Sequence, residues 1–120
     1  MPSKIRLQRI ADRIREEISE MLVMEIADPR LRGVTITEVT VDRELAYANI
    51  YVSSVDGSDH ADEILDAFEH AKGFIRSQLA GRIDLRTHPS LRFHWDSTPE
   101  RADKIDRIIN SLHQEENDND

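Results

Sequence analysis

Residues 28–53 read DPRLRGVTITEVTVDRELAYANIYVS, and the rest of the fold can be worked out from this segment. The part from 34 to 41 is rich in β-branched side chains, which are typical of a strand. Small and aliphatic residues alternate with polar and aromatic ones over 46–53, which predicts a second strand with one buried face. A short turn at 42–44 joins the two strands into a β-hairpin. The apolar phase shifts halfway along the first strand, which predicts a bulge near Glu38.

A long amphipathic helix is predicted before this hairpin. Its apolar residues recur at spacings of three and four, which places them on one helical face. They are Leu7, Ile10, Ile14, Ile18, Met21, Leu22 and Ile26. Asp28-Pro29 ends the helix, because the residue before a proline is pushed out of the helical region. Basic residues precede acidic ones on the opposite face, and this order opposes the helix dipole at roughly 0.3 to 1 kcal/mol per exposed charge.

Two further helices are predicted after the hairpin. A turn over 56–59 precedes them, with Ser58 or Asp59 expected to cap the first through its side-chain oxygen. The apolar face runs on through both helices: Ile64, Leu65, Phe68, Ala71, Ile75, Leu79 and Ile83. Gly73 interrupts this face at a cost of about 1 kcal/mol relative to alanine. We therefore predict a helix, a kink at Ala71, Lys72 and Gly73, and a second helix.

A third strand and a final helix complete the predicted order. Leu91, Phe93 and Trp95 alternate with polar residues, as in a strand with one buried face. Thr98-Pro99 is typical of a helix start, and the residues that follow carry a narrow apolar stripe: Ala102, Ile105, Ile108, Ile109 and Leu112. The fold class is therefore α+β, a three-stranded sheet covered on one face by helices. We expect a body at 1–96, a C-terminal helix at 97–113 and a disordered acidic tail at 114–120.

Composition excludes several classes of protein. The chain has 120 residues and no cysteine, so disulfide scaffolds, thiolate catalysis and cysteine-rich zinc sites are excluded. Nowhere do eighteen apolar residues run together, so neither secretion nor membrane insertion is indicated, and a cytoplasmic protein is expected. The histidines are scattered and no phosphate loop, zinc-protease motif or nucleophile elbow is present. We expect no catalysis, no cofactor and no metal.

The charge distribution points to a nucleic acid in spite of a net charge of −8. Residues 1–15 contain five basic residues and one acidic residue, and residues 70–94 also contain five basic residues and one acidic residue. The segments between and after them are acidic. Such basic groups are what neutralise phosphates. The candidate RNA-binding residues are Lys4, Arg6, Arg9 and Arg13 in the first group, Lys72, Arg76, Arg82 and Arg86 in the second, and Arg92 on the third strand.

The element order resembles a type II KH domain, an RNA-binding module that usually carries a Gly-x-x-Gly loop. This chain lacks that loop and has Ala71-Lys72-Gly73 instead, which resembles the alanine-x-glycine kink of the ribosome-binding factor A family. Similar motifs cover nearly the whole chain: Arg6-x-x-Arg9-Ile10, Ile18 to Leu22, Asp28-Pro29-Arg30, Val34 to Val39, and Ala48-x-Ile50-x-Val52. The resemblance implies a cytoplasmic monomer that binds small-subunit ribosomal RNA, assists late maturation and RNA processing, supports growth in the cold, and is released with an assembly GTPase.

Three alternatives stay open at this point. The chain can be a protein-interaction module that docks through a sheet edge or its acidic surfaces and touches RNA little. Tyr47 and Tyr51 share a strand face, where they either pack or stack on bases. Arg92 and His94 project from the third strand, where they either belong to an RNA surface or to an ordinary solvated face.

Overall fold

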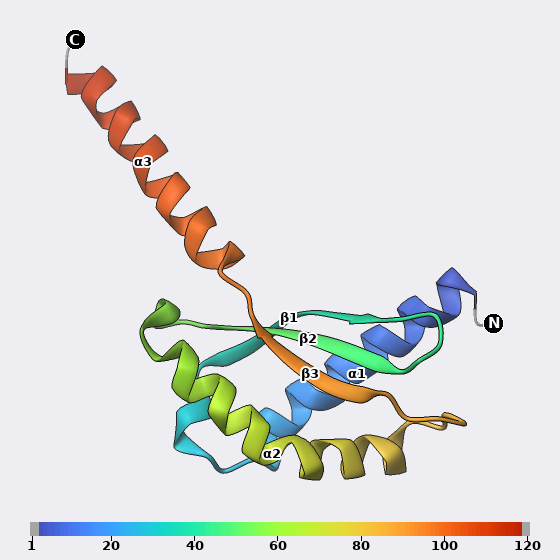
Figure 1. Ribbon diagram of the computed structural model, residues 1–120. Helices are drawn as coiled ribbons and strands as arrows, with labels where there is room; N and C mark the ends of the chain where they lie inside the picture. The colour runs from blue at the N-terminus through green and yellow to red at the C-terminus, as the bar shows by residue number, and fades with distance from the viewer. Residues whose placement is uncertain (1–2, 119–120) are drawn as a thin grey trace.

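The structure is a computed structural model that describes the backbone over residues 3–118 and the side chains over residues 3–113. It is an α+β fold with a single three-stranded sheet in the described residues (Figure 1). Its elements are α1 (Lys4–Met24), the 3-10 turn η1 (Pro29–Leu31), β1 (Val34–Val41), β2 (Tyr47–Ser54), the 3-10 turn η2 (Gly57–His60), α2 (Ala61–Arg82), β3 (Ser90–Trp95) and α3 (Thr98–Asp118).

The sheet has the order β1-β2-β3. β1 and β2 pair antiparallel as the predicted hairpin, whereas β3 pairs parallel to β2. Because parallel neighbours need a crossover, α2 carries the chain from the end of β2 back to the start of β3. The predicted bulge is confirmed, since the pairing register shifts between Ile36 and Glu38.

The core lies between the sheet and the pair formed by α1 and α2, which cover the same side of the sheet (Figure 1). The apolar face predicted for α1 is confirmed, with Ile14, Ile18 and Met21 at most 1% exposed. From α2, Phe68 stacks on Phe93 of β3 with ring centroids 4.6 Å apart. Each large aliphatic or aromatic side chain buried in this way contributes about 1.5 to 3 kcal/mol.

The predicted break between two helices at Ala71-Lys72-Gly73 is wrong, because α2 is one continuous helix. Its ribbon nevertheless changes direction near its middle (Figure 1), so the bend occurs without loss of helical structure. Burial of apolar residues on both sides of the glycine, such as Phe68 and Ile75, offsets its cost of about 1 kcal/mol. A Cβ added at Gly73 would meet nothing within 4 Å, so close crossing of helices does not require this glycine.

Two predictions about helix ends also need correction. α1 ends at Met24, several residues before Asp28-Pro29, and Asp28 instead caps the turn η1 by accepting a hydrogen bond from the Arg30 amide. Neither Ser58 nor Asp59 caps α2, because the intervening turn η2 places His60 at the cap position without a side-chain hydrogen bond.

The C-terminal helix differs most from expectation. The sequence predicts that it helps to cover the sheet, but it extends away from the body (Figure 1), and its apolar stripe is exposed at Ile105, Ile108, Ile109 and Leu112. The backbone is helical through Asp118, beyond the predicted end of the helix at residue 113, and residues 119–120 lie outside the described residues; the disordered acidic tail at 114–120 stays a prediction. Extension of a formed helix is cheap for residues such as Gln and Glu.

A bilayer-spanning helix needs a long and uninterrupted apolar segment. No helix within residues 3–118 meets that requirement.

Candidate nucleic-acid interface

The first turns of α1 present unpaired cations. Ser3 caps the helix by accepting a hydrogen bond from the Arg6 amide at 3.1 Å, so the helix begins at Lys4. Lys4, Arg6 and Arg9 are exposed, and none of their side chains has an ion-pair or hydrogen-bond partner within the described chain. The first turn contains no acid, and the positive end of the helix dipole adds to the field there. This end of α1 is therefore suited to phosphate contact.

Arg13 and Arg82 join the two basic groups at the place where α1 meets the end of α2. Arg13 pairs with Glu17 at 2.9 Å and donates to the Arg82 carbonyl oxygen at 3.5 Å. Arg82 itself pairs with Glu17 at 3.2 Å and with Glu25. The hydrogen bond to Glu25, and then that to Glu17, raises the pKa of Arg82. Two glutamates thus offset the charge of Arg82, whose main role in the structure is to link α2 to α1 and the residue that follows it.

The remaining cations of the second group are held loosely. Lys72 pairs with Glu69 one helical turn earlier at 2.9 Å, and Arg76 donates to the His88 carbonyl oxygen at 3.4 Å. Such exposed contacts contribute about 0 to 1 kcal/mol, so a phosphate can replace them. Arg86, in the loop after α2, is exposed and has no side-chain partner among residues 3–118. Lys72, Arg76 and Arg86 are consequently available to an anionic ligand.

Arg92 lies apart from the other candidates. Its neighbours Leu91 and Phe93 face the core, so Arg92 projects from the opposite, uncovered face of the sheet. Its guanidinium carbon lies 3.5 Å from the centroid of the Tyr47 ring. The structure therefore places eight of the nine predicted residues on α1, α2 and the loop after α2, and one on the open sheet face.

A motif that the sequence singled out has a structural explanation. The Arg30 side chain contacts both carboxylate oxygens of Asp28, the nearer at 2.8 Å, and also reaches Asp66 of α2 at 3.1 Å. The side-chain hydrogen bond from Arg30 lowers the pKa of Asp28. Asp28-Pro29-Arg30 thus ties the loop between α1 and β1 to α2.

Sequence reasoning missed one candidate. A hollow between α1 and the edge strand β1 is lined by Lys4, Gln8, Arg15 and residues 37–41. Arg15 belongs to the first basic group but is not among the residues predicted to bind RNA. Its position beside β1 is visible only in the tertiary structure. Because Asp12 and Glu38 also line the hollow, Arg15 and Lys4 lie there among charges of both signs.

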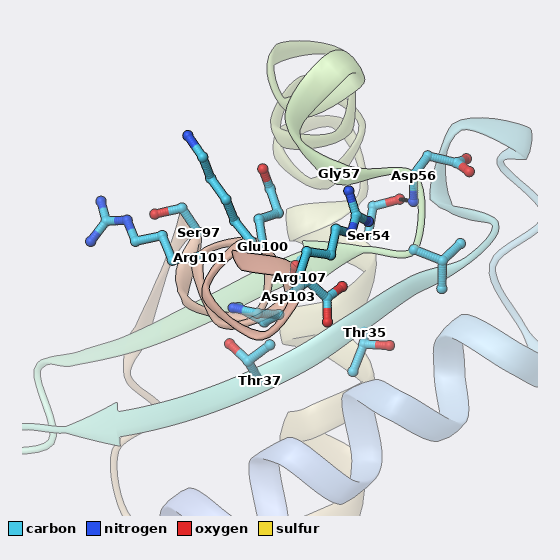
Figure 2. A pocket seen from close by; sticks show the side chains of 14 residues that line it. Thr35, Thr37, Ser54, Asp56, Gly57, Ser97, Glu100, Arg101, Asp103 and Arg107 are labelled. Carbon is cyan, nitrogen blue, oxygen red and sulfur yellow. Dashed lines mark hydrogen bonds between the residues drawn. The ribbon is translucent and has the colours of Figure 1, made fainter. Parts of the chain in front are cut away.

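A larger hollow lies where α3 leaves the sheet. Figure 2 shows the charged side of α3 above the threonines of β1, with Glu100, Lys104 and Arg107 among the lining residues. In residues 3–113 no group of three or more histidine or acidic side chains is placed to hold a metal ion.

Comparison with known proteins decides the family. The family model for ribosome-binding factor A matches residues 6–109, which include the unpaired cations Arg6 and Arg9 and the bend of α2. This chain belongs to the ribosome-binding factor A family. Family relatives are similar over most of their length. The ribosome-binding factor A of Chromohalobacter salexigens is 43% identical over 106 residues, which cover 87% of this chain and 81% of the relative. That of Staphylococcus carnosus is 34% identical over 114 residues, which cover 95% of this chain and 99% of the relative.

Solved structures of ribosome-binding factor A share the fold. The crystal structure from Thermus thermophilus superposes with a TM-score of 0.68 at 21% identity, covering 74% of this chain and 93% of that one. A homology model of the Thermus thermophilus protein has been fitted into an electron microscopy map of a 30S complex. It superposes with a TM-score of 0.61 at 25% identity, covering 73% of this chain and 93% of that one.

Proposed function

We propose that this protein binds the free, immature small ribosomal subunit through its ribosomal RNA and assists late maturation and RNA processing, including growth in the cold. It acts as a cytoplasmic monomer, catalyses no reaction, and is released with the help of an assembly GTPase. The observation that carries the proposal is that Lys4, Arg6 and Arg9, in the first turns of α1, are exposed and unpaired in a chain whose family is ribosome-binding factor A.

Phosphate contacts explain how a protein with a net negative charge can bind RNA. Lys4, Arg6 and Arg9, together with Lys72, Arg76 and Arg86, position the protein on the RNA backbone without reading sequence. The net charge of −8 repels RNA over the rest of the surface. Loose binding to any RNA is therefore suppressed, while a site of matching shape is retained.

A protein contact is the second candidate function. The stripe on α3 exposes about half of Ile105, Ile108, Ile109 and Leu112, and the helix carries six acids against three bases. An acidic helix is repelled by RNA, so this observation favours a protein partner for α3. In this alternative the protein docks with little RNA contact.

Sedimentation of the protein with small subunits separates these candidates. We expect it to migrate with free small subunits in a sucrose gradient and to leave them as salt is raised. Replacing Arg6 and Arg9 by glutamine removes two contacts, which makes the slope of log affinity against log salt shallower by about 1.4 to 1.8. The matched control is the replacement of Lys104 and Arg107, also three residues apart on an exposed helix, which should leave the slope unchanged.

Either of two results would contradict RNA binding through α1. One is migration only at the top of the gradient, which would remove the ribosomal partner. The other is an unchanged salt slope in the α1 variant together with a loss of affinity in the α3 control, which would make the protein-interaction function the leading one.

A further inference from the structure

The uncovered face of the sheet carries an ordered array of planar side chains. Ala48, Ile50 and Val52 of β2 are fully buried, so the alternate residues Tyr47, Asn49 and Tyr51 face away from the helices. On β3 the same alternation presents Arg92 and His94 on this face. The parallel register places Asn49 beside Arg92 and Tyr51 beside His94.

These side chains hold one another in place. Arg92 lies over the Tyr47 ring, 3.5 Å from its centroid. The rings of Tyr51 and His94 stack with centroids 5.1 Å apart and an interplanar angle of 28°. His94 is also linked through Nε2 to the Asn49 side-chain oxygen at 2.9 Å. The face therefore presents two preformed stacks, Tyr47 with Arg92 and Tyr51 with His94.

The open face carries charge of both signs, because Glu38 of β1 lies directly opposite Tyr51 and is exposed, while Arg92 lies on β3. Arg92 is exposed and forms no ion pair within the described residues, because its partner is the uncharged Tyr47 ring. Asp96, which directly follows β3, is occupied: its carboxylate accepts hydrogen bonds from the Thr37 hydroxyl at 2.6 Å and from the Thr98 amide at 2.9 Å. Glu38 offsets the charge of Arg92, so stacking on the planar guanidinium and the aromatic rings, rather than net charge, is the chemistry by which this face takes up unpaired bases.

The spacing of the two stacks favours unpaired over paired RNA. Tyr47 and Tyr51 are four residues apart on one strand, which corresponds to about 13 Å. Adjacent bases in a helix are only about 3.4 Å apart. Two successive bases can therefore occupy the two stacks only if they are splayed apart. A duplex is excluded because the flat faces of its bases are covered by the neighbouring base pairs.

We propose that the open sheet face binds an unpaired RNA segment, with one base on Tyr47 and Arg92 and a second on Tyr51 and His94. The proposal rests on the proposed RNA-binding function and adds a second surface, on the side of the sheet opposite α1 and α2. Beyond Tyr51 lies the hollow below α3 shown in Figure 2, whose acids Asp56, Glu100 and Asp103 disfavour a phosphate backbone, so the bound segment ends at Tyr51 and His94.

Fluorescence anisotropy with a labelled single-stranded RNA hexamer of mixed sequence, and the full chain, tests the proposal. We expect saturable binding that a duplex of the same sequence competes for poorly. Replacing Tyr47 or Tyr51 by alanine should weaken hexamer binding roughly 5- to 100-fold, whereas phenylalanine at either position retains it. Replacing Arg92 by glutamine should also make the salt slope for the hexamer shallower by about 0.7.

Control measurements keep the outcomes distinct. Circular dichroism and urea unfolding show whether each variant is folded. The variant with glutamine at Arg6 and Arg9 should lose affinity for small subunits far more than affinity for the hexamer, so failure of the proposed function and failure of this surface give different results.

Three results would overturn the proposal. The first is no binding of the hexamer by the wild-type chain. The second is unchanged hexamer binding in a folded variant with alanine at both Tyr47 and Tyr51. The third is a loss of small-subunit binding in that variant without any hexamer binding in the wild type, which would mean that a protein or folded RNA occupies this face.

Discussion

α1 and α3 are helices of equal length, but the apolar stripe is buried in α1 and exposed in α3. Each spans 21 residues and carries an apolar stripe at helical spacing. In α1 the residues Ile14 and Ile18 are at most 1% exposed, whereas Ile105 and Ile109 of α3 remain 55% and 45% exposed. An apolar stripe therefore predicts that a helix forms and which side prefers burial, but the connection to the sheet decides whether a partner is within reach.

The two connections differ in their physical constraints. After α1 the chain turns at residues 25–33 and pairs as β1 beneath the same helix. At the other end, Asp96 binds Thr37 and the Thr98 amide, and the Trp95 indole donates to Glu100 at 3.2 Å. These contacts place the charged side of α3 toward the hollow above the sheet (Figure 2), and its stripe lies on the other side of the helix.

The largest expected effect comes from shortening matched side chains on the two helices. Ile18→Ala should lower the free energy of unfolding by about 2 to 5 kcal/mol, because it opens a cavity in the closed core. Ile109→Ala should change it by no more than about 0.5 kcal/mol, since the side chain is already half in water. Urea unfolding followed by circular dichroism measures both. Equal losses in the two variants would mean that α3 packs on the body in solution.

Removal of α3 is expected to have a smaller effect on the body. A chain ending at Ser97 loses the contacts of Glu100 with Trp95 and of the Thr98 amide with Asp96, which together contribute about 1 to 3 kcal/mol. Thermal unfolding of the shortened chain should remain a single cooperative transition. A molten or unfolded product would show that α3 is required for the core and would remove the contrast with α1.

The smallest expected effect is on the pH dependence of stability. Hydrogen bonds from the Thr37 hydroxyl and the Thr98 amide lower the pKa of Asp96, and the Arg30 side chain lowers the pKa of Asp28. An aspartate with a lowered folded-state pKa stabilises the fold above the unfolded value of about 3.9, and this contribution is lost as pH falls through the lower folded value.

Replacing one aspartate at a time tests that sign. Asp96→Asn should lower the urea midpoint at pH 7 and should reduce the further loss that occurs between pH 5 and pH 3. Asp28→Asn should do the same at the connection between α1 and β1. If the wild-type midpoint rises as pH falls over this interval, the sign is wrong; if either variant keeps the full wild-type pH dependence, that aspartate is not its source.

Much of the fold could be predicted because it follows from local patterns. The β-branched run and the alternation from 46 to 53 predicted the hairpin, and the phase shift near Glu38 predicted the bulge, because side-chain period and strand pairing are coupled. The stripes of α1 and α2 were likewise confirmed by burial at Ile14 and Phe68. In each case neighbours in sequence are also neighbours in the element.

Predictions failed where contacts between distant parts of the chain determine the local structure or the pairing of a charge. Gly73 suggested a break, but burial of Phe68 and Ile75 keeps α2 continuous. For the candidate RNA surface, the sequence identified the basic side chains but not their ion-pair partners. Arg82 pairs with Glu17 only because α1 and α2 meet there, whereas Arg6 remains unpaired. Formal charge is a property of the residue, whereas availability depends on what the fold places beside it.

Local periodicity and charge order were therefore enough to predict the apolar faces of α1 and α2, the hairpin and the two basic groups. Tertiary structure alone decided that α3 projects away from the sheet, that Arg82 links two helices, and that Tyr47, Tyr51, Arg92 and His94 form one surface on the open face. The reason is that periodicity acts over a few residues, whereas these arrangements join residues that lie tens of positions apart and meet only when the sheet pairs.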